Sequence, residues 1–123
     1  MTKNTKKPKK AKKISKPKIR GKLTPKFVEL KGFLSFFVLH ELSFGAMSGD
    51  DLAKSIGERR GSVLTPGTIY PALKRLRRQK LIKYTREGRK KKYFLTSDGR
   101  KELKLLYNVF KGLFYGLKSK MYK

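Results

Sequence analysis

Positively charged side chains gather in the stretch 64–95, and their distribution indicates the chemistry of binding a polyanion. No Asp or Glu lies between Glu58 and Glu87, although Lys and Arg are frequent there. A solvated helix usually mixes acids with its bases, because opposite charges three or four residues apart stabilise it. A one-sided set of cations is more typical of a surface that meets an anion. The alternative is a solvated cationic face without a ligand.

A helix of about four turns is predicted at the start of this stretch. Thr65 suits the N-cap, and Pro66 suits the first helical position, where an N–H is not needed. Apolar residues then recur at helical spacing and predict one buried face, made of Ile69, Ala72, Leu73 and Leu76. The other sides of this helix carry its four cations.

Two short strands are predicted after the helix, at residues 81–86 and 92–95. Both are rich in the Tyr, Phe, Ile and Thr that strands favour, and Gly88 lies in the connection, residues 88–91. Lys and Arg outnumber the single acid of this hairpin, Glu87. A basic helix followed at once by a basic hairpin, or wing, favours a nucleic acid as the ligand.

The stretch TPGTIYPALKRLRRQKLI resembles the recognition-helix signature of the PadR family of winged-helix transcriptional regulators. The following GRKKKYFLTSDGRKEL resembles that family's wing and the LTxxGR motif that begins its C-terminal helix. The resemblance covers about residues 30–117. It departs at 47–51, where the family often has a His-Gly-Tyr-like motif and this chain has MSGDD, without the aromatic residue.

The resemblance implies a mainly α fold with a small β-wing, a winged helix-turn-helix followed by a C-terminal dimerisation helix. It also implies a homodimer. Some PadR-like proteins bind aromatic ligands in or near the dimer interface, but no polar set in this sequence identifies a small-molecule effector. A small-molecule effector is therefore possible but unidentified. We expect no cofactor.

Length and charge divide the chain into two regions. The 123 residues carry a formal net charge of +26, and there is no cysteine for a disulfide or a thiolate site. Residues 1–26 hold eleven Lys, one Arg and no acid, so we expect a basic disordered tail. That tail either contacts phosphates non-specifically or only keeps the protein in solution. Residues 27–123 form the predicted winged-helix domain.

Three further helices are predicted around the basic unit. Residues 27–42 form the first, and its apolar face is so wide, with Phe36 and Leu39, that we expect part of it to contact another subunit. The second spans residues 48–59 and is capped by Ser48. The last spans about 97–118, capped by Thr96 or Ser97.

The last helix carries an apolar stripe at alternating spacings of three and four residues. Such a stripe is wider than one small domain needs and favours dimerisation, although packing on the chain's own core is the alternative. The predicted dimer interface consists of Leu103, Leu106, Tyr107, Phe110, Leu113, Phe114 and Leu117.

The candidate DNA-binding residues fall into two groups, because phosphate contacts position a protein and base contacts specify the sequence. Candidates for base edges or nearby phosphates are Thr68, Tyr70 and Lys74. Candidates for phosphates are Arg75, Arg77, Arg78, Arg89, Lys90, Lys91 and Lys92.

Catalytic and metal chemistry find no support in the sequence. It has no P-loop, no Gly-x-Ser-x-Gly and no zinc-ligand spacing, and His40 is the only histidine. Asp50 and Asp51 are explained as acids in the first turn of a helix. No segment is apolar for the roughly 20 residues that span a membrane, and no signal peptide is apparent. We therefore expect a soluble protein. The resemblance implies that it is a cytoplasmic, nucleoid-associated prokaryotic protein.

The predicted function is a dimeric, sequence-specific regulator of transcription that binds double-stranded DNA. Its recognition helix would enter the major groove, and its wing would lie on the backbone or in the minor groove. One alternative is an architectural, chromatin-like DNA-binding protein of low specificity, which the tail and the high charge favour. Another is an RNA-binding or ribosome-associated protein.

Overall fold

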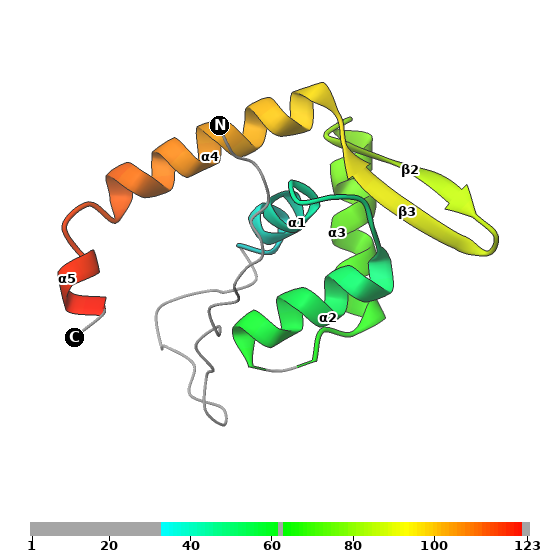
Figure 1. The fold of residues 1–123 in the computed structure, drawn as a ribbon, viewed down its shortest axis with the longest axis horizontal. Coiled ribbons are helices and arrows are strands. Elements are labelled where there is room, and N and C mark those ends of the chain that lie inside the picture. The colour runs from blue at the N-terminus through cyan, green and yellow to red at the C-terminus, as the bar shows by residue number, and fades with distance from the viewer. Residues whose placement is uncertain (1–32, 62, 122–123) are drawn as a thin grey trace.

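The computed structural model describes residues 33–61 and 63–121, so the predicted tail and the start of the predicted first helix lie outside the described residues. The elements follow in the order α1 (Leu34–Leu42), β1 (Met47–Ser48), α2 (Gly49–Arg60), α3 (Pro66–Arg78), β2 (Ile82–Glu87), β3 (Lys90–Leu95), α4 (Ser97–Leu113) and α5 (Lys118–Met121). Figure 1 shows α1, α2 and α3 packed together, with the β2–β3 hairpin projecting on one side and α4 crossing over α1. This arrangement confirms the predicted fold class.

The predicted recognition helix is α3, and its apolar face is the centre of the core. All four predicted core residues of α3 are buried. Pro66 occupies the first helical position as predicted. Thr65 has the extended backbone of an N-cap, but its hydroxyl lies 3.2 Å from the Thr68 hydroxyl and makes no capping bond to the backbone. Packing therefore holds α3 more than its cap does.

The rest of the core comes from every other long element. Its buried side chains besides those of α3 are Leu34, Val38, Leu39, Leu42, Leu52, Ile56, Leu64, Ile82, Tyr93, Leu95 and Leu103. The expectation that Leu39 contacts another subunit was wrong, because this side chain is only 1% exposed within a single chain. Phe36 is half-buried, and its ring lies 4.6 Å from that of Phe110 on α4. The wide apolar face of α1 thus packs against several elements of its own chain.

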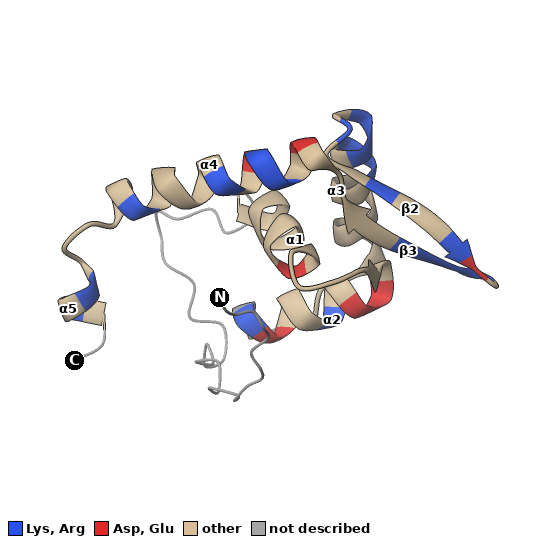
Figure 2. Cartoon of the chain, turned by 45° about the horizontal axis from the view of Figure 1, so that its top comes forward, with Lys and Arg blue, Asp and Glu red and all other residues tan. Residues whose placement is uncertain are grey.

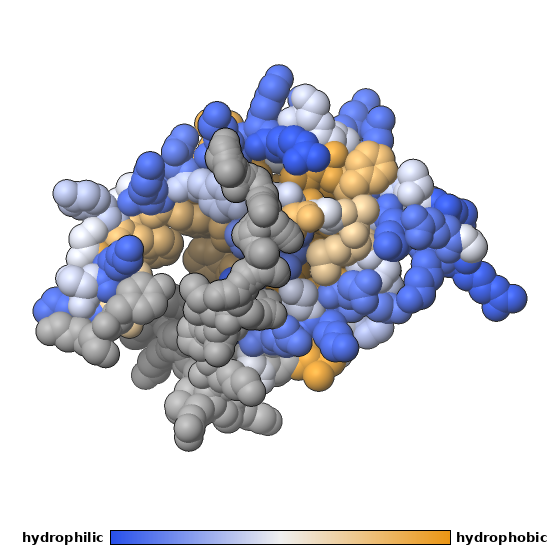
Figure 3. All heavy atoms as spheres, viewed as in Figure 1, coloured by the Kyte–Doolittle hydropathy of each residue, from blue (hydrophilic) through white to orange (hydrophobic). Residues whose placement is uncertain are grey.

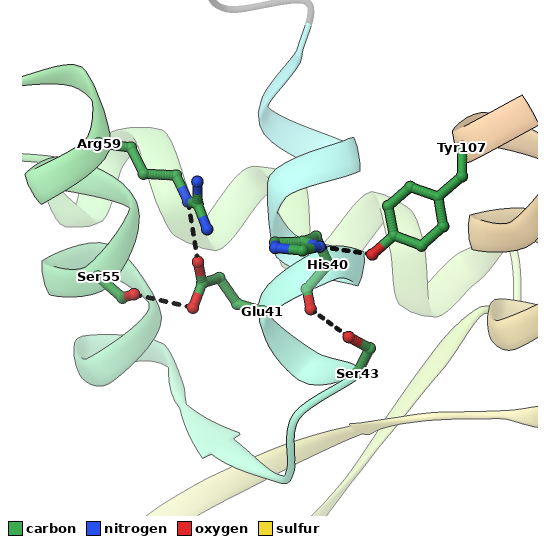
Figure 4. A network of polar contacts seen from close by, with 6 residues as sticks. All are labelled: His40, Glu41, Ser43, Ser55, Arg59 and Tyr107. Carbon is green, nitrogen blue, oxygen red and sulfur yellow. Dashed lines mark hydrogen bonds and ion pairs between the residues drawn. The ribbon is translucent and has the colours of Figure 1, made fainter. Parts of the chain in front are cut away.

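One carboxylate is buried beside this core and joins α1 to α2 (Figure 4). Glu41 accepts hydrogen bonds from the Ser55 hydroxyl at 2.8 Å and from Nε of Arg59 at 3.0 Å. A charge that leaves water is costly unless a partner and hydrogen bonds replace the lost hydration. These two partners meet that need, and they set how α2 lies against α1.

The three strands form a sheet in the order β1-β3-β2, with both pairings antiparallel. The turn of the wing is tighter than predicted: Gly88, at φ +65°, and Arg89 connect the strands. Lys90 and Lys91, predicted to lie in the tip, are the first residues of β3. The two-residue β1 was not predicted, because so short a strand has no alternating pattern.

The junction between the wing and α4 depends on Thr96 and Gly99. The Thr96 hydroxyl accepts from the backbone N–H of Gly99 at 3.0 Å, so of the two predicted candidates Thr96, and not Ser97, is the cap. The same hydroxyl donates to the carbonyl of Lys80 at 2.7 Å. A Cβ on Gly99 would overlap the carbonyl oxygen of Leu81. Gly99 therefore lets the start of α4 lie directly against the chain that leads into β2.

The last predicted helix is divided in the structure. It ends at Leu113, five residues before the predicted boundary near residue 118, and the separate α5 follows a turn that contains Gly116 at φ +83°. Glycine stabilises a helix poorly and readily takes positive φ. Among the described residues, no helix is both long and apolar enough to cross a membrane.

We predict that Gly99→Ala lowers the free energy of unfolding by about 1–3 kcal/mol, because the added methyl group would collide with the backbone of Leu81. Gly112→Ala, in the same helix, is the matched control. Nothing lies within 4 Å of a Cβ built there. Its stability should be unchanged or higher by up to about 1 kcal/mol. Chemical denaturation of both variants measures the difference, and equal stabilities would show that the close approach at Gly99 is relieved at no cost.

Candidate nucleic-acid interface

The outward side of α3 and the wing together form one basic surface. Figure 2 shows Lys and Arg along the C-terminal part of α3 and along β2 and β3, whereas α2 carries acids at both ends. The four cations of α3 are all exposed: Lys74, Arg75, Arg77 and Arg78. The space-filling view shows hydrophilic side chains over most of the projecting wing (Figure 3). The structure thus brings the predicted helix and wing cations onto adjoining elements.

Strand register divides the wing cations between two faces. Residues directly opposite one another on paired strands share a face. Lys91 lies opposite Arg86, and both lie on the face that also carries the buried Ile82 and Leu95. Arg86 was not among the predicted site residues, although alternation along the strand could have placed it with Lys91.

The other face of the wing carries Lys90 opposite Glu87, and Lys92 opposite Thr85. Nζ of Lys92 lies 3.9 Å from a carboxylate oxygen of Glu87. The predicted phosphate candidates Lys90 and Lys92 therefore share their face with the wing's one acid. Arg89 lies in the turn and is exposed.

Tyr70 is held by the start of α2. Its hydroxyl donates to Oδ1 of Asp50 at 3.1 Å, and its ring lies so close to Gly49 that a Cβ there would be 2.6 Å from the hydroxyl oxygen. Burial, followed by the hydrogen bond to Asp50 and the charge of Asp50, raises the pKa of Tyr70 above its ordinary 10.0. The side chain remains 40% exposed. Tyr70 is thus less free to contact a base than its position on the helix predicts.

A small concavity of about 270 Å³ lies between the wing and the start of α2. Its lining includes Tyr70 and Asp50 on one side and Arg89, Lys90 and Lys91 on the other. A larger, mainly apolar hollow of about 540 Å³ lies between α2 and α3, near Val63 and Ile69. The smaller hollow adjoins the basic residues of the wing turn, and the larger one is lined mainly by residues of α2 and α3.

His40 lies in an aromatic cluster away from this surface. Its Nδ1 is 2.5 Å from the hydroxyl of Tyr107 (Figure 4). Its ring stacks on Phe36, with centroids 6.0 Å apart. Within residues 33–61 and 63–121, no three His, Cys, Asp or Glu side chains are grouped so that they could hold a metal ion. His40 joins α1 to α4 here.

We predict that Asp50→Asn lowers the pKa of Tyr70, because the substitution removes the negative charge that opposes ionisation of the phenol. The hydrogen bond should be intact at neutral pH and lost as the pH rises through the raised pKa. NMR titration of tyrosine ring carbons measures the shift. Asp51→Asn is the control, since this neighbour also lies in the first turn of α2 but no contact joins it to Tyr70. Equal shifts in both variants would contradict a specific contact.

Solved structures with this fold include several regulators of one family. A PadR family transcription regulator from Clostridium difficile is 29% identical, covers 73% of this chain and 99% of its own, and has a TM-score of 0.63. A PadR-like transcription factor from Bacteroides fragilis is 27% identical, covers 73% and 91%, and has a TM-score of 0.64. A PadR-like regulator from Bacillus cereus is 25% identical, covers 76% and 96%, and has a TM-score of 0.66.

Comparison with curated proteins finds no match. Comparison with sequence families matches residues 38–105, from α1 to the middle of α4, to the transcriptional regulator PadR-like family. That span contains every core residue except Leu34, together with the recognition helix and the whole wing. It includes the Gly-Thr-Ile-Tyr-Pro string of α3 and the Leu-Thr-Ser-Asp-Gly-Arg string that begins α4. The chain belongs to the PadR-like family of transcriptional regulators, which are DNA-binding proteins and not enzymes.

Proposed function

We propose that this protein is a sequence-specific regulator that binds double-stranded DNA as a homodimer, with α3 in the major groove and the wing on the backbone or in the minor groove. The observation that carries the proposal is that the exposed Lys and Arg of α3 lie on an element next to the basic β2–β3 hairpin (Figure 2). The major groove of B-DNA is wide enough to admit an α-helix such as α3. The protein would then act at the nucleoid of a prokaryotic cell.

The exposed side chains of α3 and those of the wing have different roles in the proposed complex. Lys74 projects from the middle of α3, away from the buried face, and is our leading candidate for a base edge. Thr68 is half-buried near the start of α3, and the hydroxyl of Tyr70 is hydrogen-bonded to Asp50. Both side chains therefore reach less far toward the bases than Lys74 does. The remaining cations of α3 and the wing contact phosphates, which supply affinity without sequence information.

The proposed dimer uses a side of α4 that differs partly from the predicted stripe. Leu103 is buried in the core, and Leu106 and Phe110 are half-buried. Phe110 packs on Phe33 and Phe36 of the same chain. These three face inward, so Leu103 in particular is not available to a partner.

The exposed apolar residues of α4 lie one turn apart on an adjoining side. Leu105, Val109 and Leu113 follow at intervals of four residues and are each more than half exposed. Beyond the helix, Phe114 and Leu117 are also exposed. We call Leu105, Val109 and Leu113 the α4 ridge and propose that a second copy of the chain covers it, because an apolar ridge left in water favours association.

An architectural DNA-binding protein of low specificity is the second candidate. The net charge of +26 favours it, since counterion release gives strong binding to any duplex. The ratio of the affinity for a preferred site to that for random duplex, at physiological salt, separates the two. A specific regulator binds its site about 10³–10⁷-fold more tightly than random duplex.

We predict that Lys74→Ala and Arg89→Ala weaken binding in different ways. With a site selected from random duplexes, Lys74→Ala should cost about 1–3 kcal/mol on that site and less on other sequences. Arg89→Ala should weaken all sequences alike and reduce the slope of log K against log salt by about 0.9, as one phosphate contact is lost. Salt titrations of binding by fluorescence anisotropy measure both.

Lys104→Ala, an exposed lysine on α4, is the control for the removal of one positive charge. It should change affinity less than either variant. Equal losses on selected and random DNA for Lys74→Ala would support the architectural function instead. A wild-type protein whose affinity is independent of salt would contradict DNA binding through this surface.

We predict that Val109→Glu combined with Leu113→Glu yields monomers, because two charges would have to be buried in the proposed interface. Since a monomer engages only one half-site, its affinity for a palindromic site should fall by about 10²–10⁴-fold. Light scattering and a gel shift measure the two effects. Lys104→Glu with Lys111→Glu is the control on the exposed polar side of α4, away from the ridge, and should stay dimeric. A double ridge variant that remains dimeric would exclude this interface.

A further inference from the structure

Tyr84 lies at the boundary between the hydrophobic core and the basic wing. It is opposite Tyr93 in the hairpin, and the two rings are 5.6 Å apart. One step toward the core on the same face is the buried pair Ile82 and Leu95, and one step toward the turn is the pair Arg86 and Lys91. The face thus changes from apolar through aromatic to cationic along its length.

Two cations from different elements contact the ring of Tyr84. The guanidinium carbon of Arg77, on α3, lies 4.8 Å from the ring centroid, and Nζ of Lys91, on β3, lies 4.7 Å from it. Both distances are within the range in which a cation is attracted to an aromatic face. Neither cation is paired with an acid in the part of the chain that the structure describes. The ring therefore gives both cations a favourable contact where no acid is paired with them.

The contact leaves both cations able to bind phosphate. A guanidinium that stacks through its flat face keeps its N–H donors directed outward from its edge. An ammonium group has three donors, and a contact with an aromatic ring does not consume them all. Arg77 and Lys91 can thus be held by Tyr84 and still bind an anion.

We propose that Tyr84 is a positioning residue that holds Arg77 of the recognition helix and Lys91 of the wing in one arrangement for the DNA backbone. The proposal rests on the proposed DNA-binding function. Long cationic side chains lose conformational freedom when they bind, and holding them beforehand reduces that loss. The ring also joins the wing to α3, so that the two elements meet the duplex as one surface.

Substitutions at residue 84 separate the role of the ring from that of the hydroxyl. Tyr84→Phe keeps the ring, and its affinity should stay within about two-fold of wild type, whereas Tyr84→Leu should weaken binding to selected and random duplex alike by about 5–20-fold, from the loss of two cation–π contacts. Phe94→Leu is the matched control, because Phe94 lies on the opposite face of the hairpin. In the Arg77→Gln background, Tyr84→Leu should cost less than in the wild type.

A series of fluorinated phenylalanines at residue 84 separates electrostatics from packing. Fluorine withdraws electron density from the ring face while the ring keeps its shape, so affinity should fall stepwise with each added fluorine. The temperature of thermal unfolding should stay constant across the series. The series therefore still tests the proposal if Tyr84→Leu does not fold. The upfield ring-current shifts of the Arg77 and Lys91 side-chain protons in the free protein should persist in Tyr84→Phe.

Wild-type binding to duplex DNA separates failure of this proposal from failure of the proposed function. If the wild type binds and the fluorinated series is flat, the positioning role of Tyr84 is overturned and DNA binding stands. A wild type that does not bind duplex DNA overturns both. Equal losses for Tyr84→Leu and Phe94→Leu would also exclude a special role for this ring.

Discussion

The packing of α3 on the core decides which of its side chains meet the surroundings. Ile69, Leu73 and Leu76 are almost completely buried, so α3 cannot rotate about its axis without exposing them. Its four cations consequently face outward together, next to the wing. The other elements maintain this orientation: α1 closes the core, Glu41 ties α2 to α1, and Thr96 links the end of α3 to the start of α4.

A small domain with this much positive charge must offset the repulsion among its own cations. Ion pairs can offset little of it, because 34 Lys and Arg face only eight Asp and Glu. Arg59 pairs with the buried Glu41, and Lys92 pairs with the exposed Glu87. Exposed pairs contribute little to stability, so most of the compensation must come from burial of the core. Aromatic faces contribute as well, since Tyr84 accepts two cations and Phe37 lies under Arg59. A bound polyanion would supply the negative charge that the chain lacks and so reduce the repulsion among its cations.

The two apolar sides of α4 have different partners. One side packs on the aromatic residues of α1, where Phe36, His40 and Tyr107 lie together. The adjoining side, the α4 ridge, has no cover within the described chain. Burial of Tyr107 against this cluster raises its pKa, which fits a side chain that belongs to the protomer's own packing. A dimer built on the ridge would leave that packing undisturbed.

The amino-acid sequence alone determined the type and order of the main elements, the buried face of α3, the caps of α2 and α4 and the family. These features follow from local patterns: the helical spacing of apolar residues, the caps at helix starts, and the strings around Pro71 and Gly99. The Ser48 hydroxyl accepts from the N–H of Asp51 at 3.1 Å, and Thr96 caps α4 in the same way. The tertiary structure decided what depends on contacts between distant residues. It assigned Leu39 and Leu103 to the core, tied Tyr70 to Asp50, placed Arg77 and Lys91 on one ring, and ended α4 at Leu113. An apolar stripe shows that a surface will be covered, but the covering partner depends on how the helices cross, and no local pattern contains that information.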